Sequence, residues 1–274
     1  MNLLSITLKT HLNDLVINYN GINEKFVKTN LAAEQINSIF DQLFVKQIDM
    51  NEEDEWSRSI MKLLFGAHSS WIYSYILTSS GLNESGLMLL RRSIEFTCYL
   101  TKIMKDHSKY KLWLNRNEDI NSRKRFSDKF SIPKKYYSEK YKNLIPLIVW
   151  HDFASTYGAH GNFSTIVSKI VKDEETLEVS FQDNKRKVPI STAVNVRVAS
   201  LIIDVIVEET KKYIKDKDFL KNNYDILKKM VNDSRVEILS YDTDGKYTNE
   251  AVKAIYDDDM SAIHEMYKEI KNTV

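Results

Sequence analysis

The chain has 274 residues and a formal net charge of +1, and its hydrophobic and charged fractions, 43% and 28%, are ordinary for a globular protein. It contains only seven glycines and three prolines. An all-β fold of this length needs many tight turns, so this scarcity argues against such a fold and favours long helices. Because Cys98 is the only cysteine, an intramolecular disulfide and a thiolate zinc site are both excluded.

The first 105 residues show apolar side chains at the three- and four-residue spacing of amphipathic helices. This pattern predicts four helices, at about 4–26, 30–44, 56–78 and 83–105. The apolar face of the first helix consists of Leu4, Leu8, Leu12, Leu15, Tyr19, Ile22 and Phe26. Asn30 is a suitable N-cap for the second helix. The fourth helix is apolar nearly all round, so we expect it at the centre of the fold.

Beyond residue 105 the helical periodicity first weakens and then returns. Further helices are predicted at 144–160, 192–215, 219–231 and 260–271. No Gly/Ser-rich linker marks a domain boundary. We predict a main helical bundle over residues 1–215 and a small helical extension over residues 216–274, either separate from the bundle or packed on it.

Two short segments have the pattern of β-hairpins. Residues 177–181 alternate between apolar and polar side chains, residues 182–185 suit a turn, and residues 188–190 supply a returning strand. An Asp-Gly pair at 244–245 predicts a second hairpin turn. The predicted fold class is therefore all-α, a helical bundle with one or two small β-hairpins.

Arg91 and Glu95 are charged residues on the most apolar predicted helix, and their spacing of four places them on one face. Charges on a buried helix are costly unless they are paired. The two residues therefore form either a structural ion pair that orients neighbouring helices, or a polar site in which Arg91 binds an anion and Glu95 positions it.

Residues 151–161 are the segment richest in chemical groups. In a helix, His151 and His160 point to opposite faces, so they cannot form a metal-binding pair. His160 is interpreted either as a general acid or base, or as a hydrogen-bonded histidine at a helix end. Because buried polar groups need partners, we predict that Arg91, Glu95 and His160 meet in one cluster, which is the candidate catalytic site.

Residues 102–142 form a basic segment with 13 Lys or Arg against five Asp or Glu. Aromatic residues are interleaved with the cations, at Tyr110, Trp113, Phe126, Phe130, Tyr136, Tyr137 and Tyr141. Cations on phosphates and aromatic rings under bases are the components of single-stranded RNA binding. The same composition also describes a connector whose aromatic residues pin it to the core. The candidate nucleic-acid-binding residues are Arg116, Arg123, Lys124, Arg125, Lys134 and Lys135.

No metal or cofactor is predicted. The chain lacks a Walker loop, a dinucleotide-binding glycine fingerprint, a nucleophile elbow and a His-Glu-x-x-His motif. The segment around Gly245 resembles a calcium-binding loop only superficially, because Ala251 stands where such a loop needs a bidentate glutamate.

The first six residues lack the basic start and long apolar run of a signal peptide. The most apolar stretch, residues 60–77, is interrupted by Lys62 and His68, so it does not match a membrane span. We therefore expect a cytoplasmic protein that does not enter a membrane.

Two segments carry a family resemblance. They are GLMLLRRSIE at 86–95 and STYGAHG at 155–161. The pair resembles a group of uncharacterised bacterial all-helical proteins with an Arg-Ser-x-x-Glu helix and a later Ser-rich, His-containing turn. It is also distantly similar to HEPN domains over about residues 81–213. The resemblance implies an all-α fold, a homodimer and a place in a bacterial defence or toxin system.

HEPN nucleases carry an Arg and a His about one turn apart on one helix, and no Arg of this chain has a His at that spacing. Two hypotheses follow. The chain is either a HEPN-like interaction or regulatory module without catalysis of its own, with RNA or another polyanion as partner. Or it is an enzyme that acts on RNA or a phosphate-bearing small molecule through Arg91, Glu95 and His160.

Overall fold

The computed structural model describes residues 8–51, 53–132, 136, 139–156, 170–172, 177–179, 187–240, 253–254 and 256–257. Within these ranges the chain is mostly helical, which confirms the predicted all-α class. The predictions that concern Lys134, Lys135, His160, the hairpin turn at 244–245 and the helix at 260–271 lie outside the described residues.

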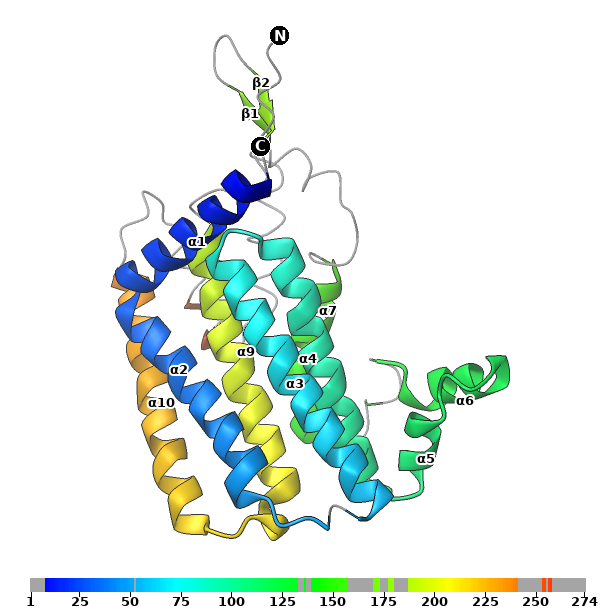
Figure 1. Cartoon of the computed structure of the whole chain (residues 1–274). Coiled ribbons are helices and arrows are strands. Elements are labelled where there is room, and N and C mark those ends of the chain that lie inside the picture. The colour runs from blue at the N-terminus through cyan, green and yellow to red at the C-terminus, as the bar shows by residue number, and fades with distance from the viewer. Residues whose placement is uncertain are drawn as a thin grey trace.

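Long helices that run side by side form the bundle (Figure 1). They are α2 (Val27–Gln42), α3 (Glu55–Ser79), α4 (Asn83–Lys105), α7 (Ile145–Ala154), α9 (Lys187–Thr210) and α10 (Lys217–Ser240), and α1 (Leu8–Lys25) lies across one end. The short turns η1 (Leu43–Gln47), η2 (Glu139–Leu144) and η4 (Lys211–Tyr213) lie in the connections. The predicted positions of α3 and α4 are confirmed to within one residue at each end.

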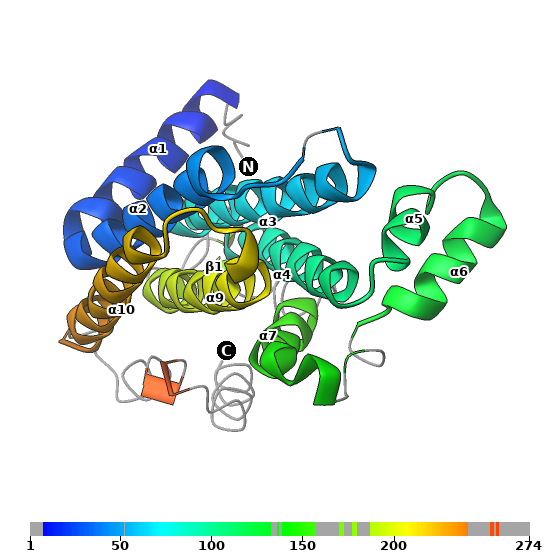
Figure 2. The same cartoon turned by 90° about the horizontal axis from the view of Figure 1, so that it is seen from below.

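Two short helices, α5 (Lys109–Leu114) and α6 (Ile120–Phe130), form the α5–α6 arm. The arm projects from the bundle beside the end of α4 (Figures 1 and 2). Asp119 is the N-cap of α6, and its carboxylate accepts a hydrogen bond from the Ser122 amide at 2.7 Å.

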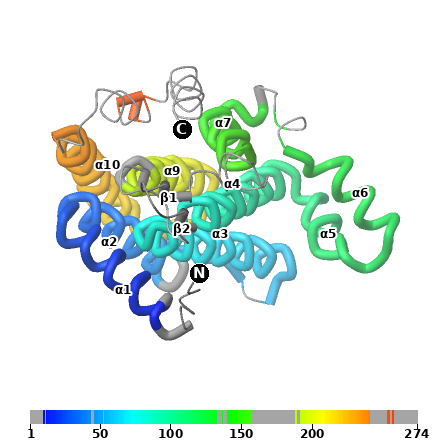
Figure 3. The backbone as a smooth tube through the Cα atoms, turned by 90° about the horizontal axis from the view of Figure 1, so that it is seen from above, coloured from blue at the N-terminus to red at the C-terminus, as the bar shows by residue number. Residues whose placement is uncertain are grey.

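Helix α9, not α4, is the central helix of the bundle. It packs against α2, α3, α4, α7 and α10, and the end-on view places it between these elements (Figure 3). Apart from Arg197, every residue from 191 to 203 is buried. The expectation for α4 is wrong because its Arg91, Arg92 and Glu95 keep one side of that helix at the surface. No helix within the described ranges has both the length and the hydropathy needed to cross a membrane.

The apolar face predicted for α1 is only partly turned to the core. Tyr19 and Ile22 pack against it, whereas the side chain of Leu12 is 51% exposed. The physical reason is that, within the part of the chain that the structure describes, α1 packs mainly against α2 and α3 at one end of the bundle, so its first turns extend beyond the core.

The strand pairing predicted after residue 177 is wrong. Strand β2 (Leu177–Val179) pairs antiparallel with β1 (Ile170–Lys172), with Val171 opposite Glu178. Residues 188–190, the predicted returning strand, belong to the first turn of α9. Pro189 fits there because a proline in the first helical turn removes no intrahelical hydrogen bond.

Helix α2 begins before the predicted cap, so Asn30 lies inside the helix rather than at its start. A side chain of α10 satisfies the first amides instead. The carboxylate of Glu237 accepts hydrogen bonds from the backbone amides of Lys28 and Thr29, each at 2.8 Å, and from the Thr29 hydroxyl at 2.9 Å. A negative group at this position also complements the helix dipole. The contact fixes α10 to α2, while the division of the chain at residue 215 stays a prediction.

Helices α3 and α4 approach each other closely at Gly86. A Cβ atom at this position would lie 2.3 Å from Thr78 Cγ2 and 3.0 Å from the Ser74 carbonyl oxygen. Both neighbours are fully buried. The absence of a side chain at Gly86 therefore sets the separation of the two helices.

A buried polar network joins α9 to α3 at the same level. The side-chain oxygen of Asn195 accepts a hydrogen bond from the Ser74 hydroxyl at 2.6 Å. Its amide nitrogen donates to the Ser191 carbonyl at 3.0 Å and to the Thr78 hydroxyl at 3.1 Å. A carbonyl can only accept, so the Ser191 contact fixes which end of the amide is nitrogen. We call these residues the Asn195 network.

Candidate functional site

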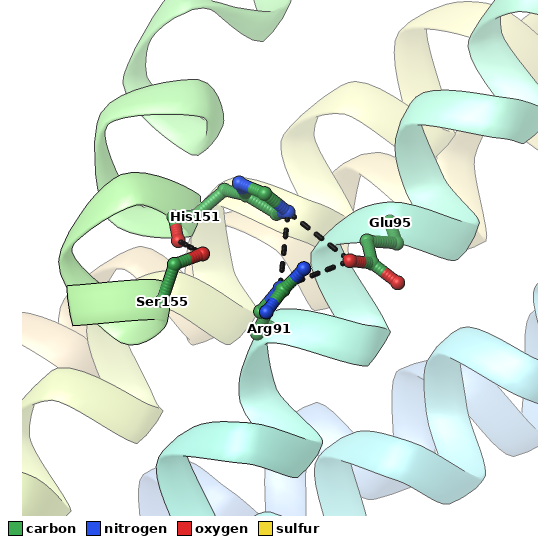
Figure 4. A network of polar contacts seen from close by, with 4 residues as sticks. All are labelled: Arg91, Glu95, His151 and Ser155. Carbon is green, nitrogen blue, oxygen red and sulfur yellow. Dashed lines mark hydrogen bonds and ion pairs between the residues drawn. The ribbon is translucent and has the colours of Figure 1, made fainter. Parts of the chain in front are cut away.

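The candidate site lies between α4 and α7, where Arg91, Glu95 and His151 meet (Figure 4). Arg91 Nε donates a hydrogen bond to Glu95 Oε1 at 3.0 Å, across one turn of α4. His151 Nε2, which α7 contributes, lies 3.2 Å from the same carboxylate oxygen and 3.4 Å from Arg91 Nε. The Arg91–Glu95–His151 cluster therefore has a single shared acceptor.

The distances favour one hydrogen arrangement in this cluster. If Nε2 of His151 carries a proton, it donates to Glu95, and Arg91 donates to the same oxygen, which has two lone pairs. If Nε2 is bare, it can accept from Arg91 but faces the carboxylate with no hydrogen between them. The contacts to Glu95 are the two shorter ones, so the form with a proton on Nε2 satisfies the geometry best.

Burial differs across the cluster. The His151 side chain is 7% exposed, whereas those of Glu95 and Arg91 are 25% and 34% exposed. Burial by itself raises the pKa of Glu95, but the hydrogen bond from His151 and the charge of Arg91 outweigh it, so this pKa lies below its usual value. Glu95 is thus an anion that accepts hydrogen bonds from His151, which is buried, and from Arg91, which is partly exposed.

The end of α7 holds the His151 backbone in place. Ser155 Oγ donates to the His151 carbonyl at 2.6 Å, one turn further along the helix (Figure 4). This contact involves the backbone of His151 and leaves the ring to Glu95. A carboxylate-oriented imidazole is suited to proton transfer, and a partly exposed guanidinium is suited to anion binding.

The structure brings Arg91 and Glu95 together, as their spacing on the helix predicts, and adds His151. Sequence reasoning considered His151 only as a metal ligand and missed it as a partner of α4. One signal was available, because His151 lies within the otherwise apolar run of residues 144–150 and 153–154. A buried polar side chain on such a helix requires a partner on a neighbouring element.

Of the candidate nucleic-acid-binding residues that the structure describes, one cation makes contacts within the protein and three are exposed. Arg116 is engaged within its own arm, where Nη1 donates to the Trp113 carbonyl at 2.6 Å and the guanidinium lies 4.4 Å from the Trp113 ring centroid. Burial lowers its pKa from the usual arginine value. Arg123, Lys124 and Arg125 are exposed on α6.

Most of the interleaved aromatic residues that the structure describes are buried, and they attach the arm to the bundle. Trp113, Phe130, Tyr136 and Tyr141 are at most 7% exposed. Lys102 of α4 is itself buried among three of these rings, 4.3 Å from the centroid of Tyr136, and donates a hydrogen bond to the Lys129 carbonyl at the end of α6. These rings therefore position the arm and do not offer their faces to bases.

No cluster of His, Cys, Asp and Glu side chains suited to a metal ion occurs within the described ranges. No known family model, curated protein or solved structure matches the chain. The function is therefore inferred from the geometry of the Arg91–Glu95–His151 cluster and of the α5–α6 arm.

Proposed function

We propose that this chain is a helical interaction module, HEPN-like and of a bacterial defence or toxin system, that binds RNA through the α5–α6 arm. The exposure of Arg123 and Lys124 on an arm that projects from the bundle carries this proposal. Among the described residues, neither side chain forms an ion pair. Exposed cations without acidic partners are free to replace the counterions of a polyanion.

The charge of the arm supports the proposal. Between residues 109 and 130 the sequence has seven Lys or Arg and three Asp or Glu. One of the acids, Asp119, is engaged as the cap of α6. Because Trp113 and Phe130 are buried, the expected contacts are made to phosphates rather than by stacking, so binding should depend little on base sequence.

A double substitution on α6 tests the proposal. The protein should bind single-stranded RNA at about 50 mM salt, and R123A/K124A should weaken binding about tenfold or more. It should also reduce the slope of log K against log salt by about 1.4, since each lost phosphate contact on a single strand contributes about 0.7. Fluorescence anisotropy over a salt series measures both quantities.

The matched control is K221A/K229A on α10, which removes the same charge from exposed positions at the far side of the bundle. It should leave the affinity and the salt slope nearly unchanged. Absence of RNA binding at about 50 mM salt, or an equal loss in both double variants, would contradict the proposal.

A second candidate function is an enzyme that acts on RNA or a phosphate-bearing small molecule through Arg91, Glu95 and a histidine. The contact of His151 with Glu95 favours it, because a carboxylate that orients an imidazole is a common acid–base arrangement. His160, the histidine predicted from the sequence, remains part of this proposal.

Glu95→Gln separates the catalytic role from the structural one. If the Arg91–Glu95 pair is purely structural, the variant should lower the free energy of unfolding by about 1 kcal/mol at pH 7. The value is small because both side chains are partly exposed. The folded pKa of Glu95 is depressed, so its contribution is present above the unfolded value of about 4.3 and is lost as pH falls through the folded value. The difference between wild type and variant should therefore shrink below about pH 4.

The enzyme candidate requires turnover of RNA or a phosphate ester by the wild type and its loss in E95Q at pH 7. Chemical denaturation between pH 3 and 7 and an RNA cleavage assay on the same samples provide both readouts. A stability loss without any wild-type turnover leaves the cluster structural.

A further inference from the structure

The α5–α6 arm contains a pocket of about 200 Å³, lined by Lys111, Leu112, Asn115, Glu118, Ser122 and Arg125. Lys111 and Leu112 lie on α5, Asn115 and Glu118 lie in or beside the turn that follows, and Ser122 and Arg125 lie on α6. The pocket is thus formed by facing sides of the two short helices. Its volume lies below the usual range of about 300–1,000 Å³ for sites of drug-sized ligands, which suits a single small group.

The polar groups of the pocket are mainly hydrogen-bond donors. Lys111 and Arg125 supply positive charge, and Asn115 supplies an amide that can donate. Phosphate oxygens are recognised in proteins by this combination of ammonium, guanidinium and amide donors. Glu118 is the acid in the lining.

The side chain of Arg125 is held in position at the pocket wall. Its Nη2 donates a hydrogen bond to Ser122 Oγ at 3.2 Å. The Ser122 amide in turn donates to Asp119, and both this bond and the Ser122 hydroxyl lower the pKa of the Asp119 carboxyl. The chain of contacts from Asp119 through Ser122 to Arg125 orders the guanidinium before a ligand arrives, which reduces the entropy lost on binding.

We infer that this pocket is a phosphate subsite, in which Lys111 and Arg125 bind one phosphate group of the RNA on the arm. The inference rests on the proposed function and adds the place where one phosphate is held. The exposed Arg123 and Lys124 contact the polyanion diffusely, whereas Lys111 and Arg125 line one half-open pocket.

Titration of the full, isotope-labelled chain with inorganic phosphate tests the inference by amide chemical shifts. The amides of Asn115 and Ser122 should shift and saturate with phosphate and should not do so with sodium chloride at the same ionic strength. K111A/R125A should weaken phosphate binding more than tenfold, whereas R123A/K124A, which leaves the pocket lining intact, should retain it.

Glu118→Gln should act in the opposite direction and strengthen phosphate binding about fivefold, because it removes the negative charge that repels the ligand. Shifts that never saturate, equal losses in the two double variants, or no gain in E118Q would overturn the subsite. The charges removed by the two double variants are equal, so a diffuse electrostatic effect predicts equal losses.

The same samples titrated with single-stranded RNA separate this inference from the proposed function. RNA binding without saturable phosphate shifts at Asn115 and Ser122 overturns the subsite and leaves the RNA-binding proposal in place. Saturable phosphate binding without RNA binding overturns the RNA-binding proposal and leaves the pocket as a site for a small phosphate. RNA that shifts the same two amides supports both.

Discussion

Asn195→Asp is expected to lower the free energy of unfolding at pH 7 by about 3–5 kcal/mol, a range typical for an unpaired buried charge. The substitution keeps the shape of the side chain and replaces the amide NH₂ by oxygen. That oxygen would lie 3.0 Å from the Ser191 carbonyl, where two acceptors face each other without a hydrogen. Asn195 is completely buried, so water cannot relieve the contact.

The loss from Asn195→Asp should diminish as pH falls, because a protonated carboxyl can again donate a hydrogen bond to Ser191. Denaturant unfolding at pH 7 and pH 4 measures the effect. Asn13→Asp, at an exposed position of α1, is the control and should change stability by less than about 0.5 kcal/mol. A similar small effect at both positions would show that the Asn195 network is not buried as described.

Gly86→Ala is expected to destabilise the protein by about 1–2 kcal/mol. The added Cβ would meet Thr78 Cγ2 at 2.3 Å and the Ser74 carbonyl at 3.0 Å, so α3 and α4 would have to move apart. Overpacking of this kind costs about 1–3 kcal/mol and sometimes more. The better helix propensity of alanine offsets about 1 kcal/mol of this cost.

The matched control for Gly86→Ala is Gly21→Ala in α1. No atom lies within 4 Å of a Cβ built at Gly21, so only the helix propensity should change. The control is expected to stabilise the protein by about 0.5–1 kcal/mol. Thermal unfolding of both variants should give shifts of opposite sign, and shifts of the same sign would contradict the close approach of α3 and α4.

The sequence predicted those helices best whose apolar spacing is regular over many turns. The ends of α3 and α4 fall within one residue of their predicted positions, because periodicity, an acidic first turn and a glycine turn all agree there. The start of α2 was misplaced by three residues. Its first amides bind Glu237, which lies 209 positions from Lys28, so the sequence around residue 27 contains no signal for the start of this helix.

Two of the three residues of the Arg91–Glu95–His151 cluster could be predicted from the sequence. Arg91 and Glu95 share a helix face through their spacing alone, and the ion pair requires nothing beyond the helix itself. His151 is 60 positions from Arg91, and its contact depends on how α7 packs against α4. The central position of α9 also depends on how the helices pack, since several helices are apolar enough to occupy the centre of the bundle.

By itself, the sequence determined the all-α class, the long helices and the basic character of residues 102–142. These properties follow from interactions within one or two turns and from composition. Tertiary structure alone decided that His151 joins Arg91 and Glu95, that Gly86 sets the contact of α3 with α4, and that the two helices of the arm line a pocket. Each of these depends on side chains from different helices meeting in one volume, and packing rather than local spacing fixes that meeting.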